Sequence, residues 1–413
     1  MKKNLILVET LHTGSGLEIM RAAIAQDIHV IFLTSEMEWA RRNIPVDLKR
    51  VMTIIPVDWR LTSVKAEVIK LLNLDEKFVL YTQRDAFIEA VARVSEELGM
   101  PFTSAKAVHI ARNKYLAREL FQNSGLASPN YLPATTLDEF HALIQLMPYP
   151  FIVKPIGGSG SKDVVIVTDE HDLPLAESLF TGENTGGFLI EEFKVGPLVS
   201  VESFSCDGQH HILGVTNRLM SQQPYFVELG YAFPCHYPEV VRKRLEDATK
   251  FVLEKLDYRF GFCHTEFVLA DETPYMIEIN PRLGGLQLGK LMSLSFGVNV
   301  YDILVNALFD ESTFPTSLVT KQATAGYVVY APKAGVIKEI KGMQTCSKYP
   351  HVHAVYPGIG VGDYAKPTTD MMGYVAQVVA TGPIAEQALV YVHSASTAIM
   401  VEVEPESESV SIH

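Results

Sequence analysis

Residues 261–280, GFCHTEFVLADETPYMIEIN, constrain the fold more than any other segment of this sequence. Two strand-like apolar runs flank ADETP, which carries residues typical of turns, so the segment predicts a β-hairpin. A hairpin centred on position 272 would place Glu266 opposite Glu278. It would also place His264 opposite Asn280. Because side chains alternate between the two faces of a strand, all four would point to one face.

Two carboxylates directly opposite each other destabilise a sheet unless something neutralises them. A hard divalent cation with oxygen ligands would do so, and two carboxylates with an amide oxygen suit Mg²⁺. The pattern therefore makes Glu266, Glu278 and Asn280 candidate metal ligands. The alternative is a solvated hairpin face whose acids bind nothing.

Arg282 and two glycines follow the hairpin in the run NPRLGG. The planar guanidinium suits a phosphate or carboxyl oxygen, and the alternative is a surface arginine in a salt bridge. Gly284 and Gly285 are expected to open the helical run LQLGKLMSLSFG. Because backbone amides at a helix start can receive an anion, both glycines and Arg282 are candidate substrate-binding residues.

A second segment, VKPIGGSGSKDVVIV, predicts a strand, a glycine-rich loop and another strand. Lys154 would lie on the first strand, and the small loop residues would let backbone amides wrap phosphates closely. The segment is not a P-loop, since GxxxxGK[ST] is absent and a strand follows the loop. A glycine loop by itself is usually a hairpin turn, but the lysine and the acidic hairpin favour a nucleotide site. The candidate loop residues are Gly157, Gly158, Ser159, Gly160 and Ser161.

The first hundred residues alternate strand-like and helix-like segments, which predicts a small parallel sheet with covering helices. Strands are expected at NLILVET, IHVIFLTS and FVLYTQ, and a helix at RDAFIEAVARVSEELG. The HTGSG turn at residues 12–16 fits a ligand loop or an ordinary strand-to-helix turn equally well. From about residue 321 the chain is expected to form short β-rich pieces, such as ATAGYVVYAP and ALVYVHSAS.

Composition argues against several classes of protein. The formal net charge is -13 and no lysine- and arginine-rich run occurs, which argues against a nucleic-acid partner. No stretch approaches ~18 uninterrupted apolar residues, and the apolar run near the N-terminus ends at Glu9, so neither a membrane span nor a signal peptide is expected. The four cysteines are scattered without metal-ligand spacing, so a reduced, cytoplasmic setting is expected.

The sequence resembles the ATP-grasp superfamily of carboxylate–amine ligases between about residues 114 and 290. The resemblance rests on five blocks in the right order: NKYLAREL, FIVKPIGGSGS, LIEEFKVGPLVSVES, HTEFVL and IEINPRLGG. It implies an α/β (α+β) ATP-grasp fold with an N-terminal βαβ domain, a glycine-loop lid subdomain and a C-terminal β-rich part. The implied domains are residues 1–110, 111–320 with the lid at about 125–195, and 321–413.

The resemblance also implies roles for single residues. Lys114 and Lys154 look like the lysines that hold ATP phosphates, and residues 157–161 look like the mobile lid loop over the β- and γ-phosphates. Arg282 matches the arginine that steadies the transferred phosphate and the oxyanion. Many relatives carry an acid near the ribose where this chain has Leu198, so no ribose ligand is assigned. The adenine linker matches Glu191, Glu192, Phe193 and Lys194, and the Mg²⁺ ligands match Glu266, Glu278 and Asn280.

The combination SVES, CHTEFVL and IEINPRLGG looks most like the L-amino-acid ligase branch, which makes dipeptides through an acyl phosphate. This implies ATP with one or two Mg²⁺ ions, or Mn²⁺, small amino-acid substrates and a homodimer. Glu202 is placed near the substrate, and Glu202 and His264 are candidate bases or positioning groups for the attacking amine. Some members take a basic amino acid such as arginine on the N-terminal side, and the acidic charge is compatible with that.

Two alternative functions stay open at this point. The first is an ATP-grasp carboxylase or purine-pathway type of ligase that uses bicarbonate or another small carboxylate. The second is a nucleotide-binding protein without turnover. The set of lysines, acids and arginine argues against the second alternative, since a pure binding module has no need for all of them.

Overall fold

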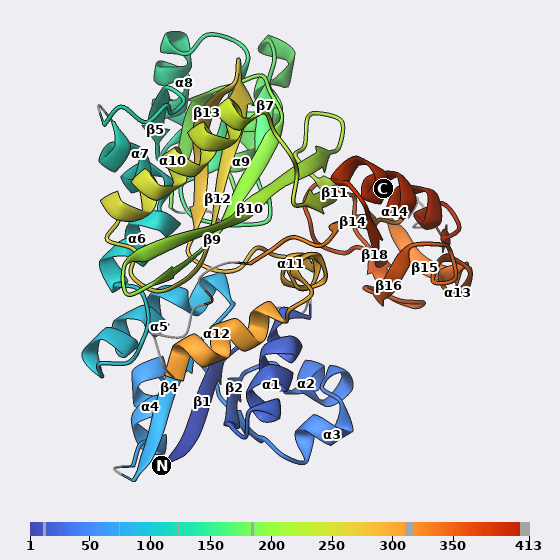
Figure 1. Cartoon of the computed structure of the whole chain (residues 1–413). Coiled ribbons are helices and arrows are strands. Elements are labelled where there is room, and N and C mark those ends of the chain that lie inside the picture. The colour runs from blue at the N-terminus through green and yellow to red at the C-terminus, as the bar shows by residue number, and fades with distance from the viewer. Residues whose placement is uncertain are drawn as a thin grey trace, which may run out of the picture.

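A computed structural model of the chain describes residues 1–10, 14–73, 75–122, 124–182, 186–309, 315 and 318–404. Within these residues the strands form four sheets covered by helices, which confirms the α/β (α+β) fold expected from the sequence. Figure 1 shows the N-terminal sheet in blue, the lid elements in teal and green at the opposite end, and the C-terminal part in orange and red at one side.

The N-terminal sheet is parallel, with the strand order β3-β2-β1-β4. Parallel neighbours need crossover connections, and helices supply them, so the expected βαβ pattern is confirmed. Of the HTGSG turn, residues 12 and 13 lie outside the described residues, and the first helix begins directly after Gly14. The elements are β1 (Lys2–Val8), α1 (Ser15–Ala25), β2 (His29–Thr34), α2 (Met37–Asn43), α3 (Val46–Lys49), β3 (Thr53–Pro56), α4 (Val64–Leu71), β4 (Glu76–Tyr81) and α5 (Asp85–Glu97).

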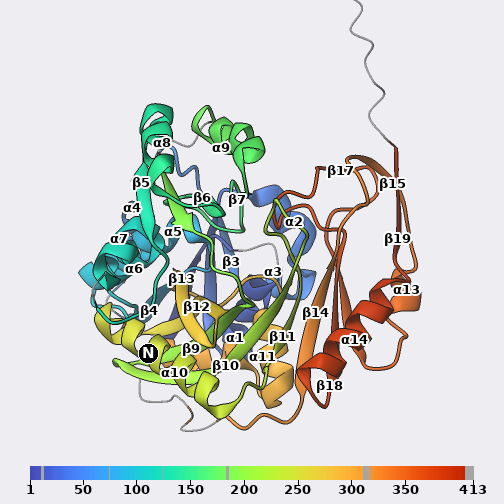
Figure 2. The ribbon, with the colours of Figure 1, turned by 90° about the horizontal axis from the view of Figure 1, so that it is seen from above.

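A smaller four-stranded sheet has the order β5-β8-β6-β7 and an apolar core of its own, which includes Phe140, Phe151 and Phe188. This subdomain, called the lid below, begins after α7 and ends before β9. The glycine-rich loop connects its strands β6 and β7. In Figure 2 the lid helices α8 and α9 lie far from the C-terminal helix α14. The elements are α6 (Ala105–Arg112), α7 (Lys114–Phe121), β5 (Tyr131–Ala134), α8 (Leu137–Leu143), η1 (Ile144–Leu146), β6 (Phe151–Pro155), β7 (Val165–Val167), η2 (Glu170–Asp172), α9 (Leu173–Phe180) and β8 (Phe188–Glu192).

The largest sheet is antiparallel and has the order β13-β12-β9-β10-β11-β14-β18-β16. Two distant segments share it, because Gly230 of β11 pairs with Tyr327 of β14. The C-terminal part therefore extends the sheet that carries the hairpin. Helix α10 packs on one face, and α11 and α12 share a core with the sheet and the N-terminal domain. The elements are β9 (Leu198–Cys206), β10 (Gln209–Met220), β11 (Glu228–Phe233), α10 (Glu239–Lys255), β12 (Gly261–Ala270), β13 (Thr273–Asn280), α11 (Leu288–Phe296), α12 (Val300–Phe309), β14 (Ala323–Val329), β16 (Val352–Pro357) and β18 (Ala376–Gly382).

The C-terminal part contains a helix where the sequence predicted a strand. The run ALVYVHSAS lies in α14 (Ala385–Ser396), so that prediction is wrong. The buried residues Ala385, Ala388, Val392 and Ala395 recur every three or four positions, which is the period of a helix face. The remaining elements are α13 (Met343–Cys346) and the strands of the sheet β17-β15-β19, namely β15 (Gly335–Lys341), β17 (Tyr364–Ala365) and β19 (Met400–Glu404).

Among the described residues, no single helix is long and apolar enough to span a membrane. Only α11 and α12 together reach that length and apolar character, and they form a pair bent by 99°.

Candidate active site

The β12–β13 hairpin adopts the register expected from the sequence. Glu266 pairs with Glu278 and His264 pairs with Asn280. A β-bulge follows directly after Glu266, so the regular pairing covers the end of the hairpin that carries the polar residues. At the other end, positions 271 and 272 both have positive φ angles, as a two-residue hairpin turn requires.

A cavity of about 290 Å³ lies between the lid and the hairpin face. Both candidate lysines, most of the glycine-rich loop and the segment from β8 line it, together with both hairpin carboxylates. Leu198 also lines the cavity, whereas Gly160 of the predicted loop does not. The predicted residues that meet here are Lys114, Lys154, Gly157, Gly158, Ser159, Ser161, Glu191, Glu192, Phe193, Lys194, Glu266 and Glu278.

Lys154 belongs to a buried charge cluster at the back of this cavity. Its ammonium lies 2.5 Å from Glu191, and Arg118 donates to the same carboxylate at 2.9 Å. Arg118 is fully buried and also donates to the carbonyl of Ile277 at 2.9 Å. Burial lowers the pKa of Lys154 to about 8, because desolvation and the neighbouring cations outweigh the attraction of Glu191. The Glu191 side chain is therefore the ion-pair partner of both Lys154 and Arg118.

Lys114 lies where the glycine-rich loop meets the hairpin. Its ammonium is 3.2 Å from Glu278 and 3.4 Å from the carbonyl oxygen of Gly158. Its backbone amide donates to the carbonyl of Ile156, which ties the start of α7 to the lid. The Lys114 ammonium therefore faces both the glycine-rich loop and the acidic face.

The hairpin acids are held by protein cations in this structure. Arg218 approaches Glu266 at 3.5 Å, and His264 approaches it at 3.2 Å. Burial opposes ionisation of Glu266, but Arg218 and His264 lower the pKa of this carboxyl to about 2. Within the described ranges, no group of three or more His, Cys, Asp or Glu side chains is arranged to hold a metal. The set of Glu266, Glu278 and the amide of Asn280 offers oxygen donors only, which fits Mg²⁺.

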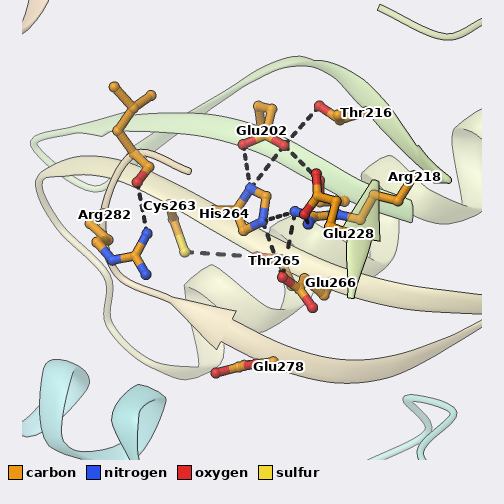
Figure 3. A network of polar contacts seen from close by, with 12 residues as sticks. Glu202, Thr216, Arg218, Glu228, Cys263, His264, Thr265, Glu266, Glu278 and Arg282 are labelled. Carbon is orange, nitrogen blue, oxygen red and sulfur yellow. Dashed lines mark hydrogen bonds and ion pairs between the residues drawn. The ribbon is translucent and has the colours of Figure 1, made fainter. Parts of the chain in front are cut away.

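Figure 3 shows a polar network beside the acidic face. The Glu202 carboxylate is buried and accepts hydrogen bonds from Ser200 at 2.7 Å and Thr216 at 2.9 Å. His264 Nδ1 lies 2.7 Å from the other oxygen of Glu202. Arg218 bridges His264 and the buried Glu228. Both oxygens of Glu202 are therefore engaged inside the protein.

The contacts of His264 define its protonation. Glu202 favours the charged ring and raises the pKa of His264 against the opposing effect of burial. Arg218, however, meets Nε2, and a guanidinium has only N–H groups to offer. Nε2 also lies 3.2 Å from the carboxylate of Glu266, which can accept an N–H from the charged ring, so both ring nitrogens are engaged inside the protein. This arrangement favours a positioning role for His264 over a role as base.

Arg282 is bound by a carboxylate from the N-terminal domain. Its Nε and Nη2 each donate to one oxygen of Asp85 at 2.7 Å, and its Nη1 donates to the carbonyl of Leu283 at 3.0 Å. The helix expected at Gly284 and Gly285 begins later, at Leu288 in α11, so the expected helix start is wrong. Gly284 instead lies against the imidazole ring, because a Cβ there would be 2.9 Å from Nδ1 of His264.

Sequence reasoning missed four charged residues of this site: Asp85, Arg118, Arg218 and Glu228. Glu228 begins the otherwise apolar strand β11, and this was the one available signal, whereas Arg218 lies in β10 among other polar residues. Asp85 and Arg118 stand on helices among other charged residues, where a solvated position is the ordinary expectation.

Comparison with known protein families agrees with the fold. Residues 111–286 match the family model described as ATP-grasp domain. Residues 111–286 are thus similar to an ATP-grasp domain, as the five sequence blocks implied. Residues 327–404 match the family model described as L-amino acid ligase C-terminal domain 2. The C-terminal part is therefore similar to that domain.

Individual relatives are distant. An uncharacterized protein of Sinorhizobium fredii is 25% identical over 401 residues, which cover 92% of this chain and 79% of that protein. The alanine–anticapsin ligase of Bacillus subtilis is 24% identical over 273 residues, or 60% of this chain and 57% of that enzyme. The chain thus matches little more than half of that ligase. A crystal structure of an L-amino acid ligase from Bacillus licheniformis shares the fold, with a TM-score of 0.82 and 22% identity over 98% of this chain and 99% of that one.

Proposed function

We propose that this protein is an ATP-dependent ligase that joins the carboxylate of one L-amino acid to the amine of a second, giving a dipeptide, ADP and phosphate. One observation carries the proposal. A cavity lined by two lysines and by the acidic hairpin face lies near Arg282, whose charge interacts with Glu278 and Glu266, in a chain whose C-terminal part matches an L-amino acid ligase domain.

ATP would bind in the cavity under the lid. The ammonium groups of Lys114 and Lys154 would contact its phosphates, and the loop residues 157–161 would cover them. The main-chain groups of Phe193 and Lys194 would face the edge of the adenine. Lys194 is held in place by Glu192 and lies over the ring of Tyr275, with its ammonium 4.4 Å from the ring centroid.

The first chemical step transfers the γ-phosphoryl group of ATP to the carboxylate of the first amino acid. Both reactants are anionic, so the site must offset their repulsion. Mg²⁺ held by Glu266, Glu278 and Asn280 would neutralise charge between them. Lys154 and Arg282 add fixed positive charge, and Arg282 would also stabilise the oxyanion when the acyl carbon becomes tetrahedral.

The second step is attack of an amine on the acyl phosphate, followed by collapse to an amide and phosphate. The amine must lose a proton on the way. The network of Glu202, His264 and Arg218 adjoins the acidic face and would orient the substrates. Because an acyl phosphate hydrolyses in water, the lid must stay closed until the amine has reacted.

The first amino-acid substrate is proposed to carry a basic side chain. The formal net charge of -13 is compatible with a cationic substrate such as arginine. Citrulline is a matched control, because it has a similar shape without the positive charge. An arginine-accepting enzyme should release phosphate with arginine and far less with citrulline.

The decisive experiment is Mg²⁺-dependent phosphate release from ATP with all pairs of the twenty L-amino acids, with mass spectrometry of each hit. The proposal expects release that needs two amino acids and yields a mass equal to their sum minus water. Silence across the whole panel would reject the dipeptide ligase. Release that requires bicarbonate would favour the carboxylase alternative, and ATP binding without ADP release under any substrate would favour a binding protein.

A further inference from the structure

Asp85 lies at the first position of α5 and contacts three different parts of the molecule. It binds Arg282 next to the hairpin through both oxygens, each at 2.7 Å. Arg112 of α6 approaches the same carboxylate at 3.2 Å. The side chain of Ser159, in the lid loop, lies close enough to this carboxyl to contribute to its lowered pKa. The Asp85 side chain is only 13% exposed, so this carboxylate is a junction of three segments.

The contacts of Arg282 fix the orientation of its guanidinium group. A guanidinium has five N–H groups in a rigid plane. Asp85 and the carbonyl of Leu283 take three of them, which leaves one N–H on each terminal nitrogen for a substrate oxygen. Because the fork is planar and bidentate, the carboxylate sets both the position and the tilt of the group. The partner that aims Arg282 therefore comes from the N-terminal domain.

The lid loop meets the same junction from the other side. Ser159 lies beside Asp85, and the next residue, Gly160, accepts a hydrogen bond from the backbone amide of Met371 at 3.3 Å. Gly158 and Gly160 have positive φ angles, which glycine adopts readily, and Ser161 also has a positive φ of 56°. The N-terminal domain and the C-terminal part thus both contact the tip of the loop.

We propose that Asp85 is a positioning residue of this enzyme: it holds Arg282 in its working orientation and provides the contact onto which the lid loop closes. The inference rests on the proposed ligase function and deepens it. Closure of the lid and alignment of the arginine then occur together, at one carboxylate. The enzyme would aim Arg282 at the acyl phosphate in the state in which water is excluded.

The test is a double-mutant cycle with D85N and R282M, read out as kcat and KM for the ligation. D85N keeps the shape of the side chain but leaves only one oxygen to accept from the N–H groups of Arg282 and Arg112. A displacement of about 1 Å at a reacting group can cost about 100-fold in rate, so kcat should fall by about 10- to 100-fold with little change in KM for ATP. In the R282M background, D85N should cost far less activity, because Arg282 is already absent and only the contact with the lid loop is lost.

Two further variants separate positioning from a loss of structure. D85E keeps the carboxylate and should recover part of the lost kcat. D58N removes an oxygen from a similar bidentate pair with Arg60 on the surface of the same domain and should leave kcat unchanged. Equal losses in the wild-type and R282M backgrounds would overturn the proposal, as would a D85N enzyme with normal kcat.

Hydrogen exchange tests the contact between Asp85 and the lid loop without requiring turnover. With Mg²⁺ and a non-hydrolysable ATP analogue, the backbone amides of residues 157–163 should exchange several-fold faster in D85N than in the wild type or D58N. Identical exchange would reject the lid contact. A wild-type enzyme that makes no dipeptide would reject the proposed function, while the exchange experiment would still decide on Asp85.

Discussion

Lys154 makes the pH dependence of nucleotide binding a direct test of the site. Its pKa is lowered to about 8 by burial, so its charge is lost as the pH rises through that value. An exposed lysine loses its charge more than two pH units higher, at about 10.4. If the ammonium binds ATP phosphates, affinity should therefore weaken in a range where ordinary lysines are still charged.

The size of the effect follows from the titration. With a pKa of about 8, about nine in ten Lys154 side chains are charged one unit below it, and about one in ten one unit above. If only the charged form contributes, the association constant for ATP should fall by about tenfold between about pH 7 and about pH 9. That change corresponds to about 1.4 kcal/mol.

Equilibrium binding of a non-hydrolysable ATP analogue with Mg²⁺, by titration calorimetry, is the appropriate assay. Turnover is unsuitable, because the α-amino group of the amino-acid substrate also titrates in this range. The matched control is K154M, which is neutral at every pH and should bind weakly with a flat profile. A flat profile in the wild type, or the same decline in K154M, would refute the assignment of Lys154.

Three further predictions concern single side chains. Glu278→Ala should abolish ADP formation with little loss of thermal stability, and wild-type turnover would contradict the metal assignment. Arg118→Leu should lower the free energy of unfolding by about 1–3 kcal/mol, since Glu191 loses its hydrogen bonds to Arg118 and keeps only Lys154; an unchanged urea midpoint would count against this. Gly284→Ala should lower Tm, because its Cβ would lie 2.4 Å from a side-chain carbon of the following helix, whereas Gly285→Ala, with no atom within 4 Å, should not. Equal Tm values for the two glycine variants would disprove the steric argument.

Local sequence was sufficient to predict the acidic face of the hairpin, because alternation along β12 and β13 defines which residues share a face. The turn at positions 271 and 272 alone would pair Glu266 with Ile277, and the bulge directly after Glu266 brings it opposite Glu278. The parallel N-terminal sheet was equally predictable, because strands and helices alternate there. The short run at residues 388–396 was not, since a few apolar residues fit the periods of both a strand and a helix.

Only the tertiary structure decided which charges meet. Arg282 and Asp85 are 197 residues apart, and Arg118 and Glu191 are 73 apart. Periodicity shows that a side chain faces inward, but it carries no information about which distant segment packs against it. Buried charges depend on such partners, because an unpaired charge away from water is very costly. The sequence by itself therefore determined the acidic face and the order of the nucleotide elements, and the packing of distant segments decided how each lysine and arginine is held.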